Sequence, residues 1–299
     1  MTATQSPPAP LAESPLSRTN ACFEGFKASD RASIATHFSP ALRHFRFIPK
    51  VERRQCAEAL VGWADTHAVH EPVKRGYAML VQAMDRFINE DLEAALRVLT
   101  ASRAIFAEHD ERDGLGLTAM LIGAIYRSFG NYDLALKVLW EGHELLKASG
   151  QYPIFVAANA NSMANIHLDR NNLDEALAMF AVTHEESQRA DDFYFTIYGL
   201  HGLGRVYMRQ EKPAEAERSF QEALERSLQH DHPLMISNSL SELATFQFRL
   251  GDLESAESYH HRALEIRQTH SLLGGAVTNC VGLAEVYSHR AEWDKALDV

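Results

Sequence analysis

Histidine is the residue type in this chain that is most suited to chemistry, and there are 15 histidines. Histidine side chains bind zinc and other transition metals, and they transfer protons near neutral pH. The two closest pairs in the sequence are His230 with His232 and His260 with His261. Adjacent residues of a helix point about 100° apart, so His260 and His261 are poorly placed to share one ion. We therefore expect no metal site and no cofactor.

Short motifs that build common active sites are missing from the sequence. There is no GxxxxGK[ST] phosphate-binding loop, no HExxH zinc motif and no GxSxG nucleophile motif. Glu185 and Glu186 are consecutive carboxylates, but they fall on a segment that is expected to be a solvated helix. We therefore expect no catalytic residues, and no enzyme in this chain.

Polar side chains suited to binding are more informative. Asn161 and Asn165 are four residues apart, which places them one turn apart on one face of a helix. An asparagine offers a donor and an acceptor together, which suits an extended peptide backbone. His201, Arg205 and Arg209 form a basic stretch that suits a carboxylate. These residues predict a peptide-binding surface, if the fold brings them together.

The elements that position these side chains repeat along the chain. Similar short segments, such as NLDEAL and DLESAE, occur six times and share an alanine. The spacings between the shared alanines are 40, 41, 40, 40 and 40 residues, for Ala95, Ala135, Ala176, Ala216, Ala256 and Ala296. A sustained period of this length is typical of a solenoid built from stacked helix pairs.

The residues around the shared alanine resemble the tetratricopeptide repeat. The pattern is most complete in one copy, which contains Leu203, Gly204, Tyr207, Ala216, Phe220 and Ala223. The resemblance covers residues 75–299 and implies an all-α, right-handed superhelical solenoid of antiparallel helix pairs. The 40-residue period exceeds the usual value of about 34, and in this respect the chain resembles the long repeats of bacterial signalling and peptide-sensor proteins.

In such a solenoid the first helix of each pair, helix A, lines the inner surface. The repeat phase then assigns a polar binding groove to the middle repeats, formed by Arg127, Asn161, Asn165, Tyr198, His201, Arg205, Asn238, Ser241, Glu242 and Thr245. The alternative is that these are simply solvated residues. The same positions of the first repeat are apolar, and we expect them to be buried against an N-terminal cap: Tyr77, Leu80, Met84 and Phe87.

Three segments are expected along the chain. Residues 1–18 are rich in proline and serine and are predicted to be a disordered tail. Residues 19–74 do not follow the repeat and are predicted to form a helical cap, because the end of a solenoid must be closed by an atypical unit. Residues 75–299 form six repeats, and the last breaks off three residues after Ala296. We therefore expect a fragment of a longer protein.

Charge and composition restrict the partners. The net charge of −11 argues against nucleic acid, which requires a basic stripe. No segment approaches the roughly 18 apolar residues of a membrane span. The three cysteines are widely spaced and form no CxxC motif, which fits a reducing compartment. We therefore expect a cytoplasmic protein with no nucleic-acid or membrane partner.

Together these features favour a non-catalytic sensory or protein-interaction module. It would bind a peptide or protein segment in its groove and regulate an output domain that is absent from this sequence. Two alternatives remain open. The array is the regulatory region of a bacterial signalling enzyme, a diguanylate cyclase with a GGDEF domain or a histidine kinase, or it is a scaffold that forms a homodimer.

Overall fold

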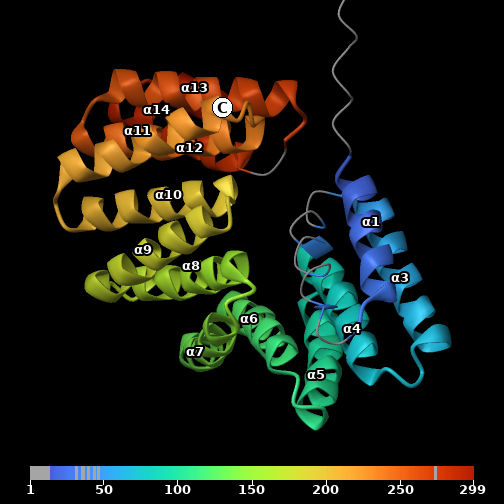
Figure 1. Ribbon diagram of the computed structural model, residues 1–299. Helices are drawn as coiled ribbons and strands as arrows, with labels where there is room; N and C mark the ends of the chain where they lie inside the picture. Colours follow the sequence, from blue (N-terminus) through green and yellow to red (C-terminus); the bar gives the residue numbers. More distant parts are fainter. Residues whose placement is uncertain are drawn as a thin grey trace, which may run out of the picture. The chain divides into compact units, whose positions relative to one another are not determined.

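The computed structural model describes residues 14–30, 33, 34, 38, 41, 42, 45, 48–272 and 275–299. Within these ranges all regular secondary structure is helical, as the sequence predicts (Figure 1). Helix α1 (Pro15–Ala28) begins inside the segment that was predicted to be disordered. The Ser14 hydroxyl accepts a hydrogen bond from the Ser17 backbone N–H, which caps this helix. The remainder of the predicted tail, residues 1–13, lies outside the described residues.

Six consecutive helix pairs follow helix α3 (Lys50–His67). The A helices are α4 (Pro72–Ile88), α6 (Arg112–Ser128), α8 (Pro153–Asp169), α10 (Phe193–Arg209), α12 (Pro233–Leu250) and α14 (Ala276–His289). The B helices are α5 (Leu92–Glu108), α7 (Tyr132–Ser149), α9 (Leu173–Arg189), α11 (Pro213–Gln229), α13 (Leu253–Thr269) and α15 (Trp293–Asp298). The shared alanine of each repeat lies in the B helix, so the predicted phase of the repeat is confirmed.

Tight turns separate the helices of each pair, and each turn uses one residue in the left-handed conformation. Gly130 and Gly251 have φ values of 74° and 84°, which glycine adopts without steric cost. The equivalent residues Glu90, Asn171 and Glu211 adopt φ values of 59° to 63° although they carry side chains. The following residue caps helix B in several repeats. Asp252, for example, accepts a hydrogen bond from Ser255 N–H at 3.0 Å.

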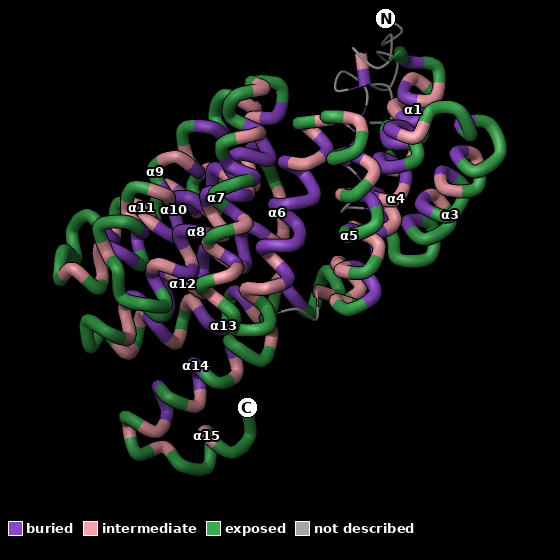
Figure 2. The backbone as a smooth tube through the Cα atoms, turned by 90° about the horizontal axis from the view of Figure 1, so that it is seen from below, coloured by how far each residue is buried: buried purple, intermediate pink, exposed green. Residues whose placement is uncertain are grey.

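Small residues allow close packing of the helices within a repeat. A Cβ atom at Gly204 of α10 would lie 2.5 Å from the Phe220 ring of α11, and one at Gly123 would overlap the Leu139 side chain of α7. The shared alanines from Ala95 to Ala256 are fully buried, as shown by Ala176 and Ala216 at 0% exposure. The buried residues of α6 and α8 form long stretches in Figure 2, whereas α15 is mostly exposed.

The helices form two compact units, residues 1–152 and residues 153–299. The first unit holds α1, α3 and the first two repeats, and the second unit holds repeats three to six. In the first unit, Tyr77 of α4 is 1% exposed and packs against Phe26 of α1 and against Phe38. Leu80 is equally buried. The expected burial of the first-repeat positions is therefore observed for these two residues.

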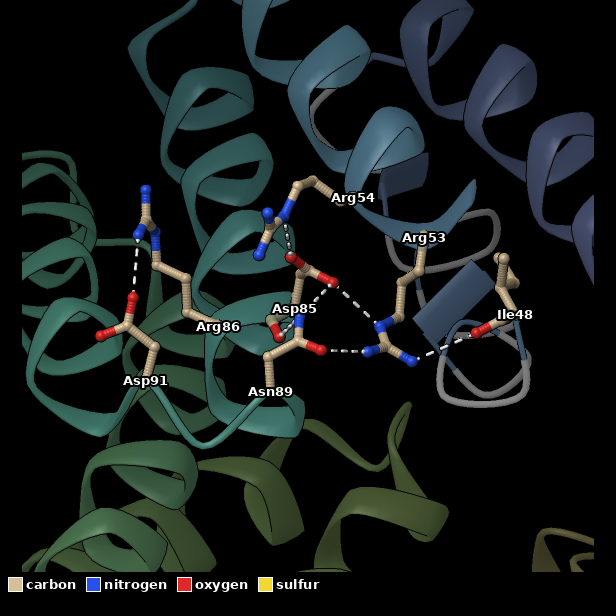
Figure 3. Close-up of polar contacts among 7 residues, drawn as sticks. All are labelled: Ile48, Arg53, Arg54, Asp85, Arg86, Asn89 and Asp91. Carbon is tan, nitrogen blue, oxygen red and sulfur yellow. Dashed lines mark hydrogen bonds and ion pairs between the residues drawn. The ribbon is translucent and has the colours of Figure 1, made fainter. Parts of the chain in front are cut away.

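A buried ion pair joins α3 to α4 in the first unit (Figure 3). Arg53 Nε donates to Asp85 Oδ1 at 2.9 Å, and both side chains are 6% exposed. The other guanidinium nitrogens of Arg53 donate to Ile48 O at 3.1 Å and to Asn89 Oδ1 at 3.0 Å. Arg53 therefore fixes α3 to the end of α4 through Asp85 and Asn89, and to the segment before α3 through Ile48.

Candidate functional site

The A helices of the second unit pack side by side, since α8 contacts α10, α10 contacts α12 and α12 contacts α14. Their half-exposed and exposed polar side chains therefore lie along one surface. We call this surface the A face, and its members are Asn161, Asn165, Tyr198, Arg205, Glu242 and Thr245. All six belong to the groove that the sequence predicts.

The two asparagines of α8 differ in what they offer a ligand. Asn165 Nδ2 donates to the backbone carbonyl of Asn161 at 2.7 Å, so one of its donors is used within the helix. Its side chain is half-buried, as is that of Asn161. The pair thus presents amide groups whose orientation is partly fixed by the helix, and such groups suit the N–H and C=O groups of an extended backbone.

Arg205 of α10 is already paired with a carboxylate of the chain. Its Nε donates to Glu242 Oε2 at 3.0 Å, and a second nitrogen contacts the other oxygen of the same carboxylate. Burial alone would raise the pKa of Glu242, but the Arg205 guanidinium lowers it below its usual value. Burial alone would likewise lower the pKa of Arg205, and pairing with Glu242 raises it. A carboxylate of a ligand would therefore have to compete with Glu242 for this arginine.

His201 is not a groove residue, and this prediction is wrong. Its side chain is 3% exposed, and its Nε2 lies 2.9 Å from the Ser239 hydroxyl between α10 and α12. Burial lowers the pKa of His201 to about 4, so the ring is neutral at pH 7 and adds no positive charge. Arg209 is also engaged, because it donates to the backbone carbonyl of Leu168. The predicted basic stretch is thus reduced to the Arg205 pair.

Asn238 and Ser241 belong to an interhelical network. Arg267 of α13 is 4% exposed and donates to Asn238 Oδ1 at 2.8 Å and to Asn279 Oδ1 at 3.0 Å. Asn279 Nδ2 in turn donates to Ser241 Oγ at 2.8 Å. The network joins α12, α13 and α14, so these two residues stabilise the packing of the last repeats. Sequence reasoning missed it because an arginine on a B helix normally extends into solvent.

The remaining predicted residues are placed as follows. Tyr198 is half-buried on α10, and Thr245 is exposed on α12, where its hydroxyl donates to the Ser241 carbonyl at 3.0 Å. Arg127 is half-buried on α6 and belongs to the first unit. It is therefore not a member of the A face.

Comparison with known proteins agrees with this architecture. Models of the tetratricopeptide repeat match residues 155–233 and residues 237–271, which span α8 to α13. The second unit therefore contains recognised tetratricopeptide repeats. The matched residues include the whole A face, so the candidate site lies within recognised tetratricopeptide repeats.

Solved structures share the fold at low sequence identity. BtubC from P. vanneervenii is 21% identical, with a TM-score of 0.61 over 75% of this chain and 94% of BtubC. A Rap protein complexed with Competence and Sporulation Factor is 16% identical, with a TM-score of 0.64 over 94% of this chain and 72% of Rap. The quorum sensor NprR from B. thuringiensis is 13% identical, with a TM-score of 0.58 over 94% of this chain and 95% of NprR. No curated protein matches the chain.

Metal clusters and membrane-spanning helices are two further features that bear on function in the described part of the chain. No three histidine, cysteine, aspartate or glutamate side chains there are grouped so that they could hold a metal ion. None of the helices in the same ranges is both long and apolar enough to cross a membrane.

Proposed function

We propose that the A face of the second unit binds an extended peptide or protein segment, and that the chain acts by binding and not by catalysis. One observation carries the proposal. The same A-helix position is occupied by Asn165, Arg205 and Thr245 in three successive repeats, and all three side chains reach solvent. An extended chain laid across these helices would meet a polar group in each repeat, which suits a regular backbone.

A second part of the proposal is that this binding regulates an output domain. It is supported by the likeness to the Rap structure complexed with Competence and Sporulation Factor and to the quorum sensor NprR. By analogy, the bound segment would be a signal, and its arrival would be transmitted through the helix pairs. This part rests on fold likeness and is therefore an analogy.

The binding proposal can be tested with a random heptapeptide library displayed on phage. Peptides selected on the purified chain would be synthesised, and their affinities for variants would be measured by calorimetry. We expect Asn165→Ala and Arg205→Ala each to weaken binding by roughly tenfold, as the loss of a hydrogen bond to a ligand does. Arg218→Ala on the B helix α11 is the matched control and should leave the affinity unchanged.

Two results would contradict the proposal. One is that no peptide is enriched above the level obtained with beads alone. The other is that Arg218→Ala no longer binds the selected peptides, whereas Asn165→Ala and Arg205→Ala bind them with unchanged affinity. The second result would favour a role for the opposite, B-helix surface in protein contacts.

A further inference from the structure

A small pocket lies beside the A face, between α12 and α14. It has a volume of about 300 Å³, and its lining includes Thr245, Phe248, His260, Val277, Val281 and Glu285. We call it the terminal pocket. Ligand sites range from about 300 to 1,000 Å³, so the terminal pocket has room for one large side chain. Thr245 belongs both to the pocket and to the A face, so the two are continuous.

The walls of the terminal pocket are largely apolar. Val277 and Val281 of α14 contribute to the lining, together with Phe248 of α12. Phe248 of α12 is half-buried, and its ring is held edge-on against the His289 ring at a centroid distance of 5.0 Å. Apolar pocket walls favour a ligand side chain that covers them with apolar surface of its own.

The floor of the pocket is uncharged. Arg267 Nε donates to Asn279 Oδ1, which turns Asn279 Nδ2 toward His260 Nδ1 at 3.1 Å. An amide nitrogen can only donate, so Nδ1 is the acceptor and the proton of His260 is on Nε2. Burial lowers the pKa of His260 to about 4, so the imidazole is neutral at pH 7. The floor therefore offers no charge to attract a carboxylate or an ammonium group into the pocket.

The rim of the pocket carries a negative charge. Glu285 lies one turn after Val281 on α14 and is exposed. No ion pair to Glu285 is formed by the described basic side chains, whereas the carboxylate of Glu242 is paired with Arg205. The chain as a whole has a net charge of −11. An exposed carboxylate in a negative environment is complementary to a lysine or arginine of a ligand.

We propose that the terminal pocket receives a bulky apolar side chain of the bound peptide, and that the adjacent residue of that peptide is a lysine or arginine facing Glu285. This inference rests on the proposed function and specifies part of its ligand. The apolar residue covers Phe248 and Val281, and the basic residue supplies the charge that the rim requires.

The test uses dipeptide probes and methyl NMR of the whole chain with labelled valines. The probes are N-acetyl-Phe-Lys-amide, N-acetyl-Phe-Glu-amide and N-acetyl-Ser-Lys-amide. We expect the methyl signals of Val277 and Val281 to shift in a saturable manner with the Phe-Lys probe. Binding of the other two probes should be at least fivefold weaker. Val51 and Val69, which are 69% and 64% exposed in the first unit, serve as controls in the same spectrum and should not shift.

Charge reversal at the rim provides the decisive comparison. In Glu285→Lys the preference should invert, so that the Phe-Glu probe binds more tightly than the Phe-Lys probe. Because Glu285 is exposed, this variant is expected to fold as the unaltered chain does. The Val281→Asp variant should lose binding of all three probes, while Val51→Asp, a matched exposed valine, should retain it.

Several results would overturn the inference. They are equal shifts at Val51 and Val281, equal affinities for the Phe-Lys and Phe-Glu probes, or an unchanged preference in Glu285→Lys. If these occur while Asn165→Ala and Arg205→Ala still weaken the selected heptapeptides, the A face binds peptide and the terminal pocket is not used. If the pocket responds and those two variants have no effect, the binding surface is confined to the last repeats.

Discussion

The first two repeats and the last four differ in the residues that occupy the same A-helix positions. At one position the first unit has Leu80 and Met120, which are 1% and 8% exposed, and the second unit has the half-buried Asn161 and Ser241, the exposed Val281 and the buried His201. At another A-helix position the first unit has Met84 and Ala124, and the second unit has Asn165, Arg205, Thr245 and Glu285. These positions are therefore apolar in the first two repeats and mostly polar in the last four.

The difference shows that a helical repeat does not by itself define a binding surface. The residues that maintain the repeat, such as Ala95 and Ala216, are equally buried in both units. The A-helix positions discussed above differ instead with their surroundings. Tyr77 contacts Phe38 of the cap, whereas Arg205 is exposed to solvent.

The buried ion pair of the first unit should have the largest effect. Replacing Arg53 by alanine leaves Asp85 buried without its main partner, and the loss of one member of a buried pair costs about 3–5 kcal/mol. We expect faster hydrogen exchange in α3 and α4 and little change in α10 to α13, measured by mass spectrometry. The double variant Arg53→Met with Asp85→Leu should recover most of the stability. Uniform exchange across both units in Arg53→Ala would contradict the division into two units.

Acid should destabilise the second unit. In this unit burial lowers the pKa of His167, His201, His232 and His260. His201 has a folded pKa of about 4, below the unfolded value of about 6.5. The unfolded chain therefore binds the proton first, and stability falls as the pH decreases from about 6.5 to about 4.

For His201 alone this loss is about 3 kcal/mol below pH 4 and about 2 kcal/mol at pH 5. Urea unfolding at pH 7.5 and pH 5, followed by hydrogen exchange, would measure the loss at pH 5. In His201→Gln the difference between the two pH values should become smaller. A pH dependence that is unchanged in this variant would show that His201 is not the group responsible.

Glycine substitutions should separate packing from helix propensity. A Cβ at Gly202 would overlap the Phe180 ring, whereas one at Gly62 of α3 has nothing within 4 Å. Gly202→Ala is therefore expected to destabilise the chain by about 1–3 kcal/mol. Gly62→Ala should stabilise it by about 0.5–1 kcal/mol, because alanine favours the helix. Thermal unfolding of both variants tests this, and equal signs of the two effects would be inconsistent with the packing described.

The A face should contribute least to stability. The side chains of Arg205 and Glu242 are 45% and 18% exposed, and partly exposed ion pairs contribute about 1 kcal/mol or less. Arg205→Ala should therefore change the midpoint of urea unfolding only slightly while it weakens peptide binding. A large loss of stability would mean that this pair, like Arg53 with Asp85, serves the fold and not a ligand.

The fold could be predicted from the sequence because its determinants recur. Ala95 through Ala296 fix the phase six times, and turn residues such as Gly130 and Gly251 mark the helix ends. The cap was predicted as helical, but its first helix begins at Pro15, since Ser14 provides a cap that the surrounding proline and serine residues obscure.

The site was predicted less completely because it depends on contacts between repeats. The phase places Arg205 and Glu242 on one surface, but their pairing requires the distance between α10 and α12. His201 has the phase of a groove residue, yet it is buried because α12 of the next repeat packs beside it. Ser239 of α12 provides the hydrogen-bond partner of its ring. The sequence did not predict the terminal pocket, because the pocket depends on how Phe248 of α12 lies beside the residues of α14.

The left-handed turn residues have an electrostatic consequence. Most of those with side chains are acidic, namely Glu90, Asp110, Asp191, Glu211 and Asp231. In the second unit, Asp191 and Asp231 occupy two consecutive turns that lead from a B helix to the next A helix, so this edge of the unit carries two neighbouring carboxylates. Such carboxylates attract cations over a range of about 8–10 Å at moderate ionic strength. A basic segment would be drawn toward the repeats before it makes any contact, and its association rate would decrease as salt is added.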